Sequence, residues 1–117
     1  MSYMLLIVEP LGQRAARTEA EGRALYGRMV EFGNDLRSRG LLVATESLKS
    51  TSDAVRVRKS GGRPVFTDGP FAEAKEMVGG FFLLTCDTRE EALRIAEQCP
   101  AAEWATVEVR EIAPCYL

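Results

Sequence analysis

The sequence predicts an α+β fold, a ferredoxin-like sandwich with the order β-α-β-β-α-β and one additional β-ribbon. Apolar runs of strand length alternate with two segments that carry an apolar stripe at helical spacing. No repeat, low-complexity tract or linker divides the 117 residues, which indicates a single domain over residues 1–117. With 46% hydrophobic and 27% charged residues, the chain is typical of a globular domain with one buried core.

The first two elements are a strand and a helix. Residues 3–8 form a continuous apolar run before Pro10, which indicates a central strand. Thr18 and Glu21 fit a capping box that begins the helix, and Gly40 suits its end. The apolar stripe of this helix consists of Leu25, Met29, Phe32 and Leu36.

The remaining elements follow from alternation, turns and a second capping signal. Residues 41–48 indicate a strand. The alternation of valine and arginine over residues 55–58 predicts a half-exposed strand. The glycine turn in "KSGGRP" then joins this strand to residues 65–67, and the two form a ribbon. Residues 78–86 form a strongly apolar strand. Thr88 and Glu91 predict a helix that Pro100 ends, and residues 104–112 supply the last strand.

One face of this sheet lacks a predicted cover. Two helices cover one face, yet "YMLLIV" and "GGFFLLTC" are apolar on both faces. An exposed apolar face of this kind marks an interface, and a homodimer would bury two such faces against each other. In the alternative, the ribbon, the loops and the C-terminal tail cover the face within a monomer.

Composition excludes several classes of function. The net charge of -2 argues against a general nucleic-acid binder, and the apolar start is too short to span a membrane. Three cysteines without a Cys-x-x-Cys pair, and no histidine, predict free thiols in a reducing cytoplasm and no metal site. There is no Gly-x-Gly-x-x-Gly, no P-loop and no residue for a histidine-ligated haem, so we expect no cofactor.

Charged residues gather in "FTDGPFAEAKEMVGGFF", residues 66–82. Asp68 either caps the turn that follows it or faces a cleft as a general acid or base. Lys75 belongs either to a surface ion-pair cluster or to a site that orients an anionic ligand. Gly79 and Gly80 indicate a bulge or a close backbone approach. The further candidate ligand-binding residues are Glu73 and Glu76 in the motif, and Tyr26 and Glu46, which could reach the same cleft.

Three stretches together resemble a known family. "MLLIVEP", "TDGPFAEAKEMVGGFFLL" and "PAAEWATVEVREI" are similar to the DGPF-motif branch of the YCII-related family, over nearly the whole chain. The resemblance implies a ferredoxin-like fold assembled as a dimeric α+β barrel. It also implies a catalytic histidine–aspartate pair, of which Asp68 matches the aspartate while the histidine has no counterpart here. DGPF-type proteins are often encoded beside extracytoplasmic-function sigma factors.

Two functions therefore compete at this point. In the first, a homodimer binds a small molecule in a cleft beside the motif, with cofactor-free acid–base chemistry by Asp68 and support from Lys75 and Glu76. In the second, the chain is a non-catalytic regulatory or interaction module that is linked to sigma-factor-dependent transcription. The sequence leaves the ligand, and whether the chain is an enzyme, open.

Overall fold

The computed structural model describes residues 1–117 and has the predicted order of elements. The strands and helices are β1 (Ser2–Pro10), α1 (Glu19–Ser38), β2 (Leu42–Ser47), β3 (Val55–Ser60), β4 (Arg63–Asp68), β5 (Glu76–Thr85), α2 (Arg89–Gln98) and β6 (Thr106–Glu111). Three short 3₁₀ turns are η1 (Arg14–Ala16), η2 (Thr51–Asp53) and η3 (Pro100–Glu103). No helix is long and apolar enough to cross a membrane.

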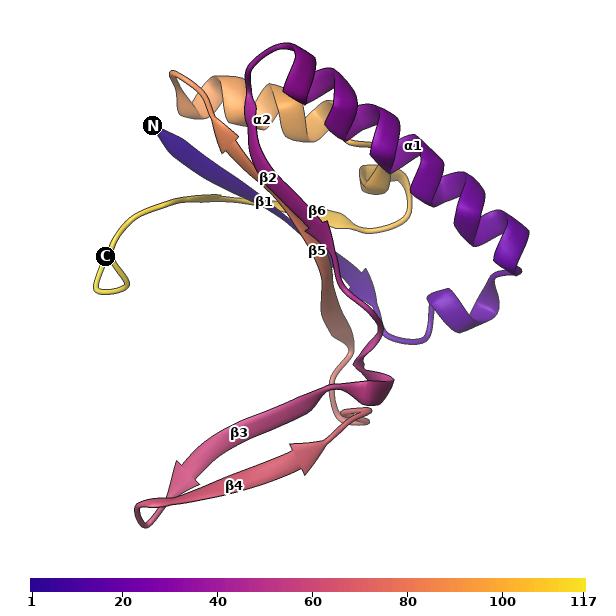
Figure 1. The fold of residues 1–117 in the computed structure, drawn as a ribbon, viewed down its shortest axis with the longest axis vertical. Helices are drawn as coiled ribbons and strands as arrows, with labels where there is room; N and C mark the ends of the chain where they lie inside the picture. Colours follow the sequence, from indigo (N-terminus) through magenta and orange to yellow (C-terminus); the bar gives the residue numbers. More distant parts are fainter.

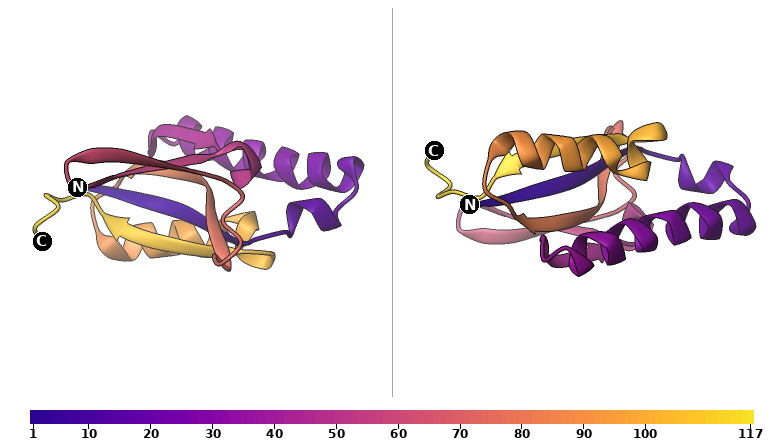
Figure 2. Two further views of the ribbon diagram at one scale, coloured as in Figure 1. Left: turned by 90° about the horizontal axis from the view of Figure 1, so that it is seen from below. Right: turned by 90° about the horizontal axis from the view of Figure 1, so that it is seen from above.

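The main sheet has the antiparallel strand order β2-β5-β1-β6, and both helices lie on one of its faces (Figure 1). This arrangement confirms the ferredoxin-like α+β fold. Strands β3 and β4 pair only with each other and form a ribbon that projects from the sheet. Figure 2 shows the two helices side by side along the sheet.

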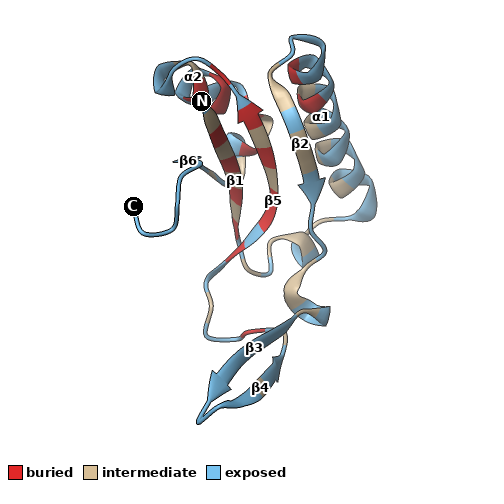
Figure 3. Cartoon of the chain, turned by 60° about the vertical axis from the view of Figure 1, so that its left-hand side comes forward, coloured by how far each residue is buried: buried red, intermediate tan, exposed pale blue.

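The core lies between the sheet and the helices. Burial alternates along β1, so that Tyr3, Leu5 and Ile7 are buried while Met4 and Leu6 are half-buried on the opposite face (Figure 3). This alternation follows from the pleat, which points successive side chains to opposite faces. The side chains with the least exposure come from both layers: Leu5, Leu36, Leu84 and Ile95.

The two predicted capping boxes differ. At α1, the Thr18 hydroxyl accepts the Glu21 N–H at 3.1 Å and the Glu21 carboxylate accepts the Thr18 N–H at 2.9 Å, as predicted. At α2, Thr88 accepts the Glu91 N–H, but the Glu91 carboxylate accepts the N–H of Asp87 instead of that of Thr88. The second box is therefore only half formed.

Helix α1 packs closely on the sheet only in its C-terminal half. Leu36 is fully buried, and Phe32 meets Phe82 edge to face with ring centroids 5.2 Å apart. Toward the N-terminus of the helix, Leu25 is only half-buried and Tyr26 is 58% exposed. The predicted apolar stripe is present, but its first part faces open space.

Candidate functional site

A cleft of about 480 Å³ lies between the N-terminal half of α1 and the sheet. This volume is within the roughly 300–1,000 Å³ range of small-molecule sites. A smaller hollow of about 170 Å³ adjoins it along α1 and β2 and shares Tyr26, Met29 and Thr45 with it. The apolar lining of the cleft includes Ile7, Leu25, Met29, Phe82, Ala101 and Trp104.

One face of α1 supplies the wall opposite the sheet. Gly22, Leu25, Tyr26 and Met29 all line the cleft, and their spacings of 3, 1 and 3 place them on one side of a helix. A Cβ atom built on Gly22 would meet no atom within 4 Å, so this glycine leaves the cleft open where α1 begins.

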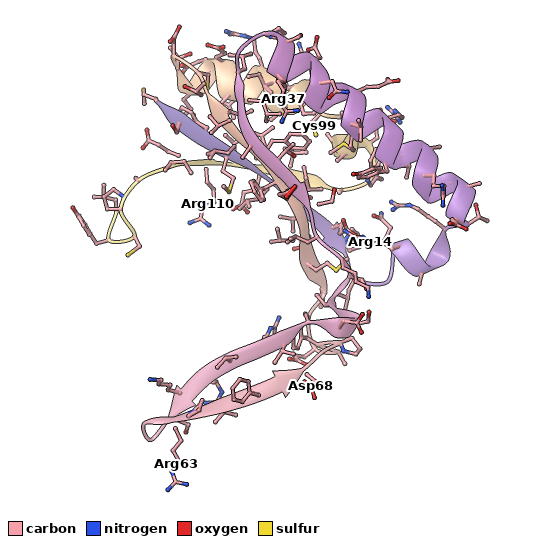
Figure 4. The ribbon with its side chains drawn as sticks, viewed as in Figure 1. Arg14, Arg37, Arg63, Asp68, Cys99 and Arg110 are labelled. Atoms are coloured by element: carbon pink, nitrogen blue, oxygen red, sulfur yellow. The ribbon has the colours of Figure 1, made fainter.

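A partly buried ion pair lies at the sheet side of the cleft. Glu9 is only 6% exposed, and its Oε1 accepts the Arg14 Nε–H at 2.6 Å. Arg14 Nη2 donates to Glu9 Oε2 at 3.2 Å and to the Gly79 carbonyl at 3.3 Å, and Nη1 donates to the Leu48 carbonyl at 2.7 Å. Arg14 thus ties together β1, the end of β2 and β5 (Figure 4).

The β5 backbone adapts to this ion pair through a bulge. Ile7 pairs with Gly80 and Val8 with Val78, which leaves Gly79 as the extra residue. A Cβ atom on Gly79 would lie 2.1 Å from Glu9 Oε2, so only glycine fits here without displacement. The bulge and the close approach predicted for the two glycines are both present. Gly79 approaches the Glu9 carboxylate, and a Cβ atom on Gly80 would lie 2.8 Å from the Glu46 carbonyl oxygen.

Charged side chains surround the mouth of the cleft. Arg23 pairs with Glu19 at 3.0 Å, on side chains that are both highly exposed. Arg17 is half-buried, lines the cleft and forms no ion pair or side-chain hydrogen bond. Arg28 is not among the lining residues, but its guanidinium lies 5.5 Å from the ring centroid of Trp104, which lines the cleft. Arg28 forms an ion pair with Glu103, which lowers the pKa of that carboxyl mainly through the hydrogen bond.

The DGPF turn lies at the base of the ribbon, outside the cleft. Gly69 is required there, because a Cβ atom would lie 1.9 Å from the Thr51 carbonyl oxygen. Phe71 is buried, with the Arg56 guanidinium 3.6 Å from its ring centroid. The Asp68 carboxylate is exposed at the end of β4 and makes no hydrogen bond, and no helix follows for it to cap. Figure 4 shows Asp68 on the ribbon, apart from Arg14.

The other candidate residues of the motif also lie outside the cleft lining. Glu73 Oε1 lies 3.8 Å from Arg56 Nη1. Lys75 and Glu76 are exposed and form no ion pair. Tyr26 and Glu46 do line the cleft, together with Gly79–Phe82 at the end of the motif. The structure therefore brings Tyr26 and Glu46 to the cleft, with the Glu46 side chain on the sheet face that points away from α1. It leaves Asp68, Glu73, Lys75 and Glu76 near the ribbon.

Sequence reasoning missed Glu9, Arg14, Arg17 and Trp104. A signal for Glu9 was present, since it has the same odd parity in β1 as Leu5 and Ile7 and must point to the same face. Arg14 and Arg17 stand in a polar stretch with no periodicity, so their positions depend on tertiary contacts.

The cysteines are free and offer no activated nucleophile within the core. Cys86 and Cys99 are buried, and Cys115 is exposed. Burial raises the pKa of the Cys99 thiol to about 11, so this thiol stays protonated at neutral pH. Burial is also the main cause that raises the pKa of Cys86. Both buried thiols act as apolar packing.

Comparisons with known proteins show where the chain belongs. A Rhizobium meliloti (strain 1021) protein, described as uncharacterised, is 40% identical over 76 residues, which make up 63% of this chain and 61% of that protein. The match thus spans less than two thirds of that relative's length. The family model of the YCII-related domain matches residues 1–115, and the chain belongs to this family.

Proposed function

We propose that the chain binds a small organic molecule in the cleft between α1 and the sheet. The observation that carries this proposal is the combination of volume and lining. Apolar side chains from both layers line a cleft of about 480 Å³ together with charged ones, while the partly buried Glu9–Arg14 ion pair holds the strand ends in place. Ligand sites have this composition, with mostly apolar walls and a few fixed polar groups.

The cleft is also adjacent to the end of the motif that contains Gly79 and Gly80. Gly79–Phe82 line it, and Gly79 accommodates the Glu9 carboxylate. On the sequence "TDGPF" at residues 67–71 we also assign the chain to the DGPF-motif branch. Its three free cysteines favour the cytoplasm as its place of action.

A cleft-filling variant tests the proposal. N-phenyl-1-naphthylamine, a neutral aromatic probe that fluoresces in apolar surroundings, should bind the native chain. Gly22→Phe should abolish this binding, because the new ring enters the cleft from α1. Gly27→Phe is the matched control, since Gly27 is on the same helix, has open space around it and does not line the cleft.

Fluorescence titration with the probe measures both effects, and circular dichroism checks that both variants keep the fold. If the native chain does not bind the probe, or if Gly22→Phe binds it as well as Gly27→Phe does, the cleft is not a ligand site.

Acid–base chemistry by Asp68 is a separate proposal that needs a second copy of the chain. Within one protomer, Asp68 does not line the cleft, so it would act on a bound molecule only if the ribbon of one protomer reached its partner's cleft. Asp68→Asn should then alter probe binding. Unchanged binding in that variant would leave Asp68 without a part in the site.

The ribbon supports a second candidate function, as an interaction module. Val55, Val57 and Phe66 are each more than half exposed, and the register of the ribbon places them on one face. A sigma factor is the partner that the resemblance suggests. A pull-down with purified sigma factor should recover the native chain but not Phe66→Ser, and no recovery of either would end this proposal.

A further inference from the structure

We propose that the molecule in the cleft is an amphipathic anion, with an aromatic or aliphatic body and one acidic group that Arg17 binds. This inference rests on the proposed function above and names the chemical class of its ligand. It follows from the charged side chains that line the cleft and from which of them have an ion-pair partner.

Two of the cations at the cleft already have an ion-pair partner. Arg14 is paired with the buried Glu9, and Arg23 with Glu19. Arg17 alone among the cleft-lining arginines has no ion-pair partner. Glu21 lies in the first turn of α1, just after Arg17. Its Oε1 accepts the Thr18 N–H, and the charge of Arg17 is only the least of the causes that act on the pKa of this carboxyl, without an ion pair between the two side chains.

Glu46 does not offset the charge of Arg17 inside the cleft. The Thr45 methyl group lies 4.0 Å from the Cβ position of Gly33, so Thr45 points toward α1. Successive side chains of a strand point to opposite faces, which directs the Glu46 side chain away from α1. The side chains that face the cleft therefore leave one positive charge without a partner.

A half-buried guanidinium without a partner favours an anion. Partial removal from water weakens the hydration of Arg17, and a carboxylate, sulfonate or phosphate oxygen would replace that hydration with charge-assisted hydrogen bonds. The ion pair and carbonyl contacts of Arg14 use four of its five N–H groups, so Arg17 is the main donor for such an anion.

The part of the cleft further along α1 suits the body of such a molecule. Phe82, Met29 and Trp104 form apolar surface deeper between α1 and the sheet, whereas Arg17 precedes the first turn of α1. A ligand with its acidic group at the start of α1 would place its apolar part among these side chains.

A pair of matched probes tests the inference. The dye 8-anilinonaphthalene-1-sulfonate is N-phenyl-1-naphthylamine with one added sulfonate. We expect the native chain to bind the sulfonate roughly tenfold more tightly, the usual scale of a charge-assisted hydrogen bond. Arg17→Gln should remove this advantage and leave the affinity for the neutral probe unchanged. Arg94→Gln, on the exposed face of α2 and outside the cleft, changes the net charge equally and should preserve the advantage.

The outcomes separate the two proposals. If both probes bind, but Arg17→Gln and Arg94→Gln affect the sulfonate probe alike, the anion inference is wrong and the binding cleft remains. If the two probes bind equally tightly to the native chain, the inference is also wrong. If neither probe binds, or if both still bind to Gly22→Phe, the cleft itself is refuted and the inference with it.

Discussion

Glu9 shows how one inward-facing carboxylate shapes its surroundings. Its position in β1 directs it into the core side of the sheet, where the Arg14 guanidinium holds both of its oxygens. Burying a charge is costly unless it is paired and hydrogen-bonded, so this pairing is required. Gly79 then provides the space, because any side chain there would collide with Glu9 Oε2.

Replacing Gly79 should test this account. We expect Gly79→Ala to lower the free energy of unfolding by about 1–3 kcal/mol, the usual cost of overpacking. The cost should fall when Glu9→Ala is combined with it, because the colliding carboxylate is then absent and contacting residues do not act additively. Urea denaturation of both single variants and the double variant measures this coupling.

Gly27→Ala is the matched control for this experiment. Its Cβ atom meets nothing within 4 Å, so the same change should stabilise α1 by up to about 1 kcal/mol. If the two changes in unfolding free energy, for Gly79→Ala and Glu9→Ala, simply add in the double variant, the Glu9 carboxylate is not the reason why position 79 requires glycine.

At the scale of elements, the start of α1 matters because it forms one side of the cleft mouth. Thr18 and Glu21 satisfy each other's backbone N–H groups in the capping box. The pKa of Glu21 is lowered from its ordinary value of 4.5, first by the hydrogen bond from the Thr18 backbone and then by its side chain. A lowered folded-state pKa stabilises the fold above pH 4.5, and this contribution is lost as the pH falls through the lowered value.

Thr18→Ala should therefore cost about 1 kcal/mol of unfolding free energy at neutral pH. Glu21→Gln keeps an oxygen for the Thr18 N–H but does not titrate. The unfolding free energy of this variant should therefore fall less between neutral and acidic pH than that of the native chain. Urea unfolding at several pH values measures both. Glu19→Gln, which changes the same charge outside the box, is the control, and an equally reduced fall there would contradict the assignment.

At the scale of the whole molecule, the sheet face opposite the helices has no cover. The half-exposed side chains of this face come from β1 and β5: Met4, Leu6, Val8, Val78, Phe81 and Leu83. The ribbon and the C-terminal segment lie on this side of the sheet without covering it (Figure 1). Arg110 projects on the same face from β6, beside Glu108 (Figure 4). A homodimer that buries two such faces remains our proposal for the assembly.

Light scattering coupled to size exclusion should give the native chain the mass of two protomers. Leu83→Arg should yield a monomer, because it would bring two like charges into an apolar interface. Leu93→Arg places the same charge on the exposed face of α2, and this variant should remain dimeric. A native chain that elutes with the mass of one protomer would remove the dimer from consideration.

The sequence by itself determined the order of elements, the capping box at Thr18 and the glycine bulge. These features depend on neighbours within a few residues, on periodicity and on turn chemistry, all of which are visible in the chain. The alternation of β1 also predicts that Glu9 is buried on the same face as Leu5 and Ile7, although a charged residue is not expected there.

Only the tertiary structure decided where the candidate site lies. Asp68 and its charged neighbours gather in the sequence, yet the ribbon carries Asp68 into solvent while α1 opens a cleft elsewhere. Arg14 contacts segments 34 and 65 residues further along the chain, and no local pattern encodes such contacts. The cleft exists because α1 packs on the sheet at one end only, and this depends on how two layers fit together.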